Sequence, residues 1–98
     1  MLVVIATLTG KSDKREELTA VLGEAAAGTR SEDGCLMYSM TRDLEDPDRY
    51  LSVELWQDQA ALDAHFVGPN IAKLFAAAGD LFAGGADIKT YETNGPKG

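Results

Sequence analysis

The sequence predicts an α+β domain of the ferredoxin-like type, with the element order β-α-β-β-α-β and a four-stranded antiparallel sheet. Three observations carry this prediction. Strand-like runs rich in β-branched, aromatic and aliphatic residues occur at 2–8, 35–42, 50–56 and 87–92. Segments with helical spacing of apolar residues separate the first strand from the second and the third from the fourth. A short acidic turn containing Asp-Pro-Asp joins the two middle strands as a hairpin.

The first strand, residues 2–8, is apolar at both alternating positions, which is typical of a strand buried on both faces. Gly10 ends it. Ser12 or Asp13 is then expected to open a helix, and Asp13 with Glu16 three residues later has the spacing of a capping box. Gly28 and the polar segment TRSEDG end that helix. Its apolar residues recur at helical spacing: Leu18, Val21, Leu22, Ala25 and Ala26.

The third strand has two chemically different faces. One face carries Leu51, Val53 and Leu55, and the other carries Tyr50, Ser52, Glu54 and Trp56. Because alternate residues of a strand point to opposite sides, Glu54 and Trp56 share one face. In this fold both helices cover one sheet face and leave the other bare. An apolar sheet face is too large to leave in water, so we expect a second copy of the chain to cover it in a two-fold dimer.

The second half of the chain predicts two helical segments and a last strand. Asp58 is a suitable cap for the first segment, which contains Ala61, Leu62, His65 and Phe66. Gly68-Pro69 ends it, and Pro69 suits the first turn of the next helix. That helix carries an apolar stripe formed by Ile71, Leu74, Phe75, Ala78 and Phe82. Gly84-Gly85 forms a turn before the last strand, residues 87–92. We expect one domain over residues 1–93 and a loose tail at 94–98.

Composition excludes several classes of function. The 98 residues carry a formal net charge of -7, which argues against binding to nucleic acid or to an anionic membrane surface. One cysteine and one histidine provide no intrachain disulfide and no convincing metal site. There is no run of about 20 apolar residues, no basic leader segment and no glycine-rich phosphate loop. We therefore expect a cytoplasmic protein without a nucleotide cofactor.

His65 and Glu54 are the candidate catalytic residues. His65 is the one side chain whose unperturbed pKa lies near neutrality, and it shares a helix face with Ala61 and Leu62, so it should point inward. The alternative is a histidine held by a backbone carbonyl. Glu54 lies on a central strand and should be at least partly buried, where a carboxylate needs a partner. It either makes a structural link, or orients His65, or acts as a base.

Four further residues are candidate substrate contacts. Trp56 and Phe66 could form the wall of an apolar pocket, although Trp56 could equally belong to the core. Tyr38 has the parity to lie beside Glu54 if the hairpin register allows it. Asn70 is either a polar pocket residue or a polar residue in the first turn of its helix. Cys35 is most simply a small buried apolar residue.

An ordered set of residues between Gly34 and Ile71 resembles the antibiotic biosynthesis monooxygenase domain family. The set comprises Gly34-Cys35-Leu36, Tyr38, Asp46-Pro47, Glu54 and Trp56, Ala60-Ala61-Leu62, and His65 four residues before Pro69. With the flanking strands, the resemblance covers about residues 2–92. It implies a dimeric α+β barrel. Members of this family include cofactor-free oxygenases of quinols and anthrones, haem-degrading enzymes, isomerases of small sugar-derived signals, and proteins without an assigned activity.

Two departures from the family pattern narrow the choice among these activities. The haem-degrading members have an Asn in the first strand, which this chain lacks, and their iron ligand falls nearer Leu74 than His65, so we expect no haem. Many members also have a second histidine where this chain has Asn70, which cannot act as a base near neutral pH.

The resemblance favours oxidation of a small aromatic quinol- or anthrone-like substrate by O2, without a metal or organic cofactor. The alternatives are an isomerase of a small carbonyl compound and a non-catalytic dimeric binding or stress-related module.

Overall fold

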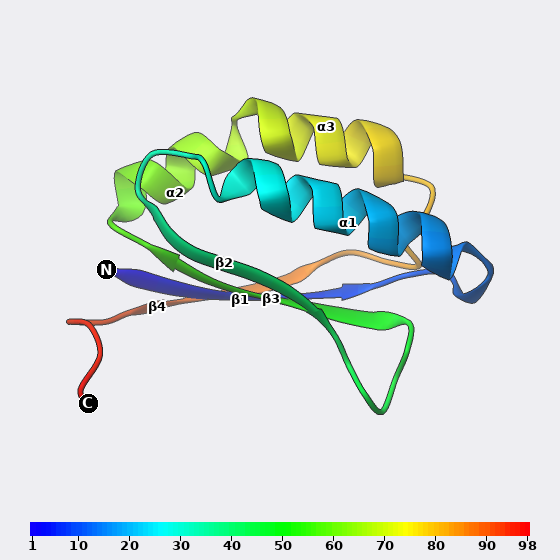
Figure 1. Ribbon diagram of the computed structural model, residues 1–98, viewed down its shortest axis with the longest axis horizontal. Coiled ribbons are helices and arrows are strands. Elements are labelled where there is room, and N and C mark those ends of the chain that lie inside the picture. The colour runs from blue at the N-terminus through cyan, green and yellow to red at the C-terminus, as the bar shows by residue number, and fades with distance from the viewer.

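The computed structural model describes residues 1–98 and has the predicted order of elements. It comprises β1 (Leu2–Thr9), a short 3-10 helix η1 (Ser12–Lys14), α1 (Arg15–Thr29), β2 (Cys35–Arg42), β3 (Arg49–Trp56), α2 (Gln59–Phe66), α3 (Pro69–Ala78) and β4 (Asp87–Glu92). The three α-helices form one layer over a single sheet, as Figure 1 shows. The ferredoxin-like α+β fold is thereby confirmed.

The sheet is antiparallel throughout, with the strand order β2-β3-β1-β4. The hairpin register places Tyr38 of β2 directly opposite Glu54 of β3. Residues opposed in this way have side chains close enough to interact. The alternation of residues along the strands suggests that Tyr38 and Glu54 are neighbours only if the hairpin register allows it. The observed register places the two side chains on the same face.

Two local predictions are wrong. The capping box does not form: α1 begins at Arg15 without a side-chain cap, and the Ser12 hydroxyl instead binds Asp48 at 2.6 Å. Helix α3 ends at Ala78, so Phe82 belongs to the segment that follows and forms an isolated bridge with Gly10. Within the single chain, strand β1 is deeply buried on one face only, because the helices cover one side of the sheet. Burial of its other face stays a prediction that depends on a second copy of the chain.

The helix-facing side of β3 carries the mixed polar and aromatic residues. Ser52, Glu54 and Trp56 are all buried beneath the helices. The aliphatic residues of the same strand lie on the opposite face. The sequence pattern therefore places an acid inside the protein and leaves leucine and valine outside, because a strand cannot bury both faces under one helical layer.

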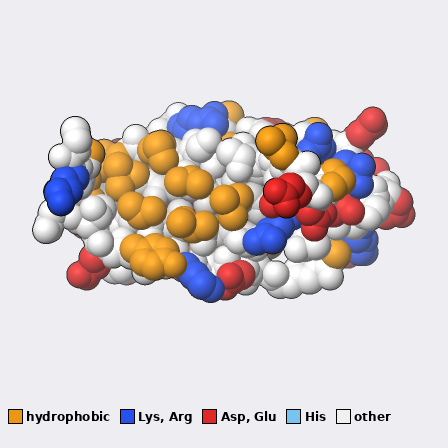
Figure 2. Space-filling model, turned by 90° about the horizontal axis from the view of Figure 1, so that it is seen from below, with side chains coloured by type: hydrophobic (Ala, Val, Ile, Leu, Met, Phe, Trp, Pro, Cys, Tyr) orange, Lys and Arg blue, Asp and Glu red, His pale blue; other side chains and the backbone are white.

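The open sheet face is largely apolar. Figure 2 shows a continuous hydrophobic patch on this side of the molecule. By register, the patch includes Val3 and Ile5 of β1, Leu51, Val53 and Leu55 of β3, Met37 of β2, and Tyr91 of β4. Met37 and Tyr91 are about half exposed. Separately, no helix of the chain combines the length and the apolar character needed to cross a bilayer.

Candidate active site

An apolar cavity of about 200 Å³ lies between the helix-facing side of the sheet and helices α2 and α3. Its polar lining comes from four residues: Tyr38, Ser52, Glu54 and His65. The rest is mainly apolar and includes Leu8, Met40, Ile71, Phe75, Phe82 and Ile88. A small apolar cavity with a few convergent polar groups is the usual form of a site for a small organic molecule.

His65 lies on α2 with its side chain only 2% exposed. Asp58 caps this helix by accepting a hydrogen bond from the Ala61 amide at 2.9 Å, as the sequence predicted. The imidazole packs against the Trp56 ring, with 4.7 Å between ring centroids, and against Phe66 at 5.5 Å. These contacts hold the ring in one orientation at the cavity wall.

The partner of His65 is Glu32, from the loop between α1 and β2. The Nδ1 atom of His65 lies 2.8 Å from Oε1 of Glu32, and the Asn70 amide donates to Oε2 of the same carboxylate at 2.7 Å. A carboxylate can only accept, so Nδ1 carries the hydrogen and Nε2 carries the lone pair of the neutral ring. Every side-chain nitrogen or oxygen that is fully shielded from solvent has a hydrogen-bond partner. Nε2 of His65 has no such partner in the protein, so it is not fully shielded. The space that His65 borders is the cavity.

Two glycines allow this arrangement. Gly34 has a φ of +80°, which favours glycine, and a Cβ there would overlap Ala61 of α2. The loop can therefore press against α2 and bring Glu32 to His65. Gly28 of α1 is the second: a Cβ at this position would overlap the Asn70 amide. The absence of a side chain at Gly28 thus allows Asn70 to reach Glu32.

Glu54 is 4% exposed and is held by its neighbours on the same strand. Its Oε2 accepts from the Ser52 hydroxyl at 2.7 Å, and its Oε1 accepts from the Trp56 indole at 2.9 Å. The spacing of two residues puts all three side chains on one face of β3. Hydrogen bonds to both oxygens replace the contacts with water that the carboxylate loses on burial.

Burial, and secondly the charge of Glu54, raise the pKa of Tyr38 well above its ordinary value of 10.0. Tyr38 therefore remains a neutral phenol at physiological pH and can donate a hydrogen bond. Burial also raises the pKa of the Cys35 thiol, with smaller contributions from the charges of Glu32 and Glu54. A thiol held in its neutral form is a poor nucleophile. Cys35 packs against the core as an apolar residue, but it is only partly buried and not fully buried as predicted.

The structure brings four of the six predicted site residues to the cavity wall: Tyr38, Glu54, His65 and Phe66. Trp56 is fully buried and lies behind His65 and Glu54, and Asn70 lies behind Glu32. Of the alternatives for Glu54, the structure shows a structural link, to Ser52 and Trp56, and Glu32 is the carboxylate beside His65. Sequence reasoning missed Glu32 since it lies in a polar loop, and only the position of that loop against α2 reveals its role.

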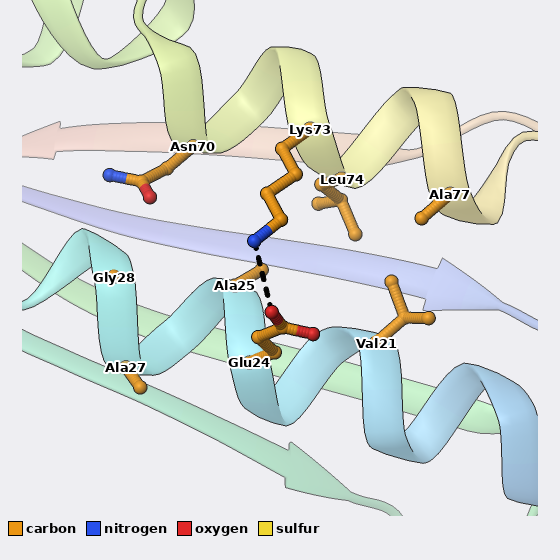
Figure 3. A pocket seen from close by; sticks show the side chains of 9 residues that line it. All are labelled: Val21, Glu24, Ala25, Ala27, Gly28, Asn70, Lys73, Leu74 and Ala77. Atoms are coloured by element: carbon orange, nitrogen blue, oxygen red, sulfur yellow. Dashed lines mark hydrogen bonds and ion pairs between the residues drawn. The ribbon is translucent and has the colours of Figure 1, made fainter.

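A second hollow of about 320 Å³ lies outside the cavity, between α1 and α3. Figure 3 shows Lys73 and Glu24 joined across it, with Asn70 beside Gly28 at one end. The Lys73–Glu24 ion pair, at 3.0 Å, is well exposed on both sides. This groove contains no buried titratable side chain, so the chemistry lies on the other side of Asn70, at His65.

His65 and Glu32 are the two side chains of the site that lie together and could ligate a metal, whereas the third candidate, Glu54, is bound to Ser52 and Trp56. No further His, Cys, Asp or Glu joins them to make a group of three. Their mutual hydrogen bond also occupies the Nδ1 atom and one carboxylate oxygen. The geometry is that of an imidazole held by a carboxylate, an arrangement that orients a general base.

Comparison with known proteins places this chain in a family. The sequence profile described as antibiotic biosynthesis monooxygenase matches residues 1–77. An uncharacterized protein of Synechocystis, sll1783, is 36% identical over 91 residues. The match covers 93% of this chain and 62% of the Synechocystis protein, so the chain spans less than two thirds of that relative.

Solved structures share the whole fold. A candidate antibiotic biosynthesis monooxygenase from Deinococcus radiodurans is 28% identical, with a TM-score of 0.91 and coverage of 100% of this chain and 97% of that one. One from Caulobacter crescentus is 30% identical, with a TM-score of 0.88 and coverage of 94% and 88%. PA3566 from Pseudomonas aeruginosa is 28% identical, with a TM-score of 0.87 and coverage of 96% and 94%.

Proposed function

Because the chain belongs to the antibiotic biosynthesis monooxygenase family, we propose that it is a monooxygenase acting on a small aromatic quinol- or anthrone-like substrate. It uses O2 directly, without a metal or organic cofactor. The observation that carries this proposal is the Glu32–His65 pair, whose free Nε2 borders an apolar cavity. A deprotonated quinol supplies its own electrons to O2, so the protein needs only a base, hydrogen-bond partners and a site without water.

His65 is the general base of this mechanism. The substrate hydroxyl donates to Nε2, which takes the proton as the substrate becomes electron-rich. Glu32 stabilises the imidazolium that forms, since the carboxylate is 2.8 Å from Nδ1. General base catalysis of this kind contributes typically about 10²–10⁴-fold to the rate. Glu32 is therefore a positioning residue that acts through His65.

Tyr38 and Glu54 complete the polar end of the cavity. The neutral Tyr38 hydroxyl is a donor for a substrate oxygen, and Glu54 is an acceptor for a second substrate hydroxyl. For a quinol, one oxygen atom enters a ring C–H bond and the other leaves in water. One quinol and one O2 thus give one hydroxyquinone and one water. The quinol supplies all four electrons that reduce O2, so no external reductant is needed.

The open sheet face supports a second proposal, that the protein is a two-fold dimer. The patch of aliphatic residues on β1 and β3 would be buried against the same patch of a second copy. Such a dimer also removes from water the face that lies directly beneath the cavity-lining strands.

Oxygen uptake by metal-free protein with a panel of reduced quinones and anthrones tests the proposal. Wild type should consume O2 above the rate of autoxidation, and His65→Ala should lose about 10²–10⁴-fold of that increment. Asp63→Ala, which removes an exposed acid from the same helix, is the control and should retain activity.

An isomerase of a small carbonyl compound could use the same base, but its turnover would be independent of O2. A non-catalytic module would show changed stability in the Glu54 and His65 variants and no turnover. No uptake across the panel in folded wild-type protein would contradict the oxygenase proposal and favour one of these two alternatives.

A further inference from the structure

The cavity contains one full negative charge and no positive one. Glu54 lies in its wall, held by Ser52 and Trp56, and no lysine or arginine lines the cavity. The second carboxylate of the site, Glu32, lies behind His65. Its charge stabilises a protonated His65 ring and does not contact a ligand in the cavity. An anionic ligand would therefore enter a low-dielectric space beside an acid, without a cation to pair with.

The remaining polar atoms are also mostly acceptors. Nε2 of the neutral His65 ring presents a lone pair, and Glu54 presents carboxylate oxygens, while the Tyr38 hydroxyl is a donor. A ligand that matches this set offers hydroxyl hydrogens to His65 and Glu54. Phenols do so, whereas carboxylates offer only acceptors.

The volume of the cavity limits the size of the ligand. A cavity of about 150 Å³ lined by aliphatic and aromatic side chains binds benzene. The cavity described here measures about 200 Å³ and has a similar apolar lining on α3 and around Phe82. It has room for one substituted ring or for two fused rings, and a third ring would have to project past the half-exposed Phe66 and Phe75 at the edge.

We propose that this cavity selects uncharged hydroxyaromatic molecules of one or two rings, and that Glu54 is the specificity-determining residue that rejects their carboxylated counterparts. This inference rests on the proposed function, and it narrows the substrate to small neutral quinols. It gives Glu54 a role separate from that of the base. The carboxylate accepts a hydrogen bond from a neutral ligand, and its charge repels an anionic one.

The test compares two ligands of nearly equal shape by isothermal titration calorimetry, 3-hydroxybenzamide and 3-hydroxybenzoate. Both carry the phenol, and only the benzoate carries a charge. In wild type the amide should bind at least about tenfold more tightly, because the acid would face Glu54 across a small apolar space. In Glu54→Gln that preference should fall below about threefold, since the variant removes the charge and keeps the shape.

Matched variants separate this effect from general charge and from misfolding. Glu24→Gln removes an acid from the exposed groove outside the cavity and should retain the tenfold preference. Should Glu54→Gln fail to fold, Glu54→Leu provides the same reading, with an apolar side chain in place of the carboxylate. A parallel titration with 2-naphthol and 9-phenanthrol tests the size limit, and only the two-ring compound should bind well.

Equal binding of amide and acid to wild type, or a preference unchanged in the Glu54 variants, would overturn the inference. So would the absence of binding by any of the neutral ligands. The titrations involve no turnover. Selective binding without oxygen uptake would therefore overturn the oxygenase proposal alone, whereas oxygen uptake with unselective binding would overturn this inference alone.

Discussion

His65 and Glu32 lie thirty-three positions apart in the sequence, and a hydrogen bond of 2.8 Å between Nδ1 and Oε1 joins them inside the protein. The bond fixes the imidazole as the Nδ1–H tautomer and leaves Nε2 free at the cavity. Asn70 binds the other oxygen of Glu32, so the carboxylate cannot rotate away. The single histidine of the chain is thereby prepared to accept a proton from a small ligand.

The tautomer of His65 should depend on Glu32. Imidazole ¹⁵N chemical shifts report which ring nitrogen carries the hydrogen, and a chain with one histidine needs no assignment. Wild type should show the Nδ1–H form of the neutral ring. Glu32→Ala removes the acceptor and should shift the population toward the Nε2–H form, which free imidazole side chains prefer.

Asp33→Ala is the matched control for this measurement, because Asp33 is an exposed acid in the same loop. It should leave the ¹⁵N shifts of His65 unchanged. A wild-type ring that is already in the Nε2–H form would refute the proposed orientation of the base.

Two glycines of α1 should respond differently to the same substitution. Gly23 is exposed with open space around it, so Gly23→Ala should raise the free energy of unfolding by about 0.5–1 kcal/mol through helix propensity. Gly28→Ala has the same propensity gain, but its Cβ overlaps the Asn70 amide. Displacing Asn70 loses a hydrogen bond to a charged group, worth about 1.5–3 kcal/mol, so the net change should be destabilising.

Urea unfolding of the two variants measures this difference, with the change in midpoint read at constant slope. If Gly28→Ala were as stabilising as Gly23→Ala, Asn70 would be free to move and its support of Glu32 would be unimportant.

Alkaline pH should weaken the fold through Tyr38. Burial and the Glu54 charge raise the pKa of this phenol in the folded state, whereas the unfolded chain keeps a value near 10. Tyr38 therefore contributes stability that is fully present below about pH 10 and is lost as the pH rises above it. Tyr38→Phe should remove this part of the pH dependence.

The measurement is the free energy of unfolding of wild type and Tyr38→Phe between about pH 9 and about pH 11, where unfolded tyrosine ionises. Parallel curves for wild type and Tyr38→Phe would show that Tyr38 ionises as easily in the fold as in the unfolded chain.

The open sheet face should determine the oligomeric state. Val53 lies in the middle of this face, opposite Ile5 of β1. Val53→Arg places a charge where a second copy is proposed to pack, so light scattering should show a dimer for wild type and a monomer for the variant. Ala20→Arg, at an exposed position of α1 on the helix side of the molecule, should remain dimeric. A monomeric wild type would contradict the proposed dimer.

Much of the fold could be predicted from the sequence, because local patterns determine it. Alternation in residues 50–56, the Asp-Pro-Asp turn and the Asp58 cap each depend on neighbours within a few positions. The start of α1 was mispredicted because Ser12 binds Asp48, thirty-six positions away, in place of capping the helix. Tertiary contacts override local signals in such cases.

The candidate site was only half predictable for the same reason. Glu54 and Trp56 could be paired because their spacing on one strand is fixed, and a hydrogen bond of 2.9 Å joins them. The acid that binds His65 could not be chosen from sequence, since the β2–β3 hairpin separates Glu32 from α2, which carries His65. The one local indication is Gly34, which has a positive φ and lies where the loop packs closely against α2.

The most direct test of the central claim is the fate of oxygen during turnover. Purified metal-free protein would be supplied with ¹⁸O2 and a neutral one- or two-ring quinol, and the product mass measured for wild type and His65→Ala. The account predicts one ¹⁸O atom in each product molecule, at a rate that falls by about 10²–10⁴-fold in the variant. Product without ¹⁸O, product formed equally well without O2, or an unchanged rate in His65→Ala would contradict an oxygenase that uses His65 as its base.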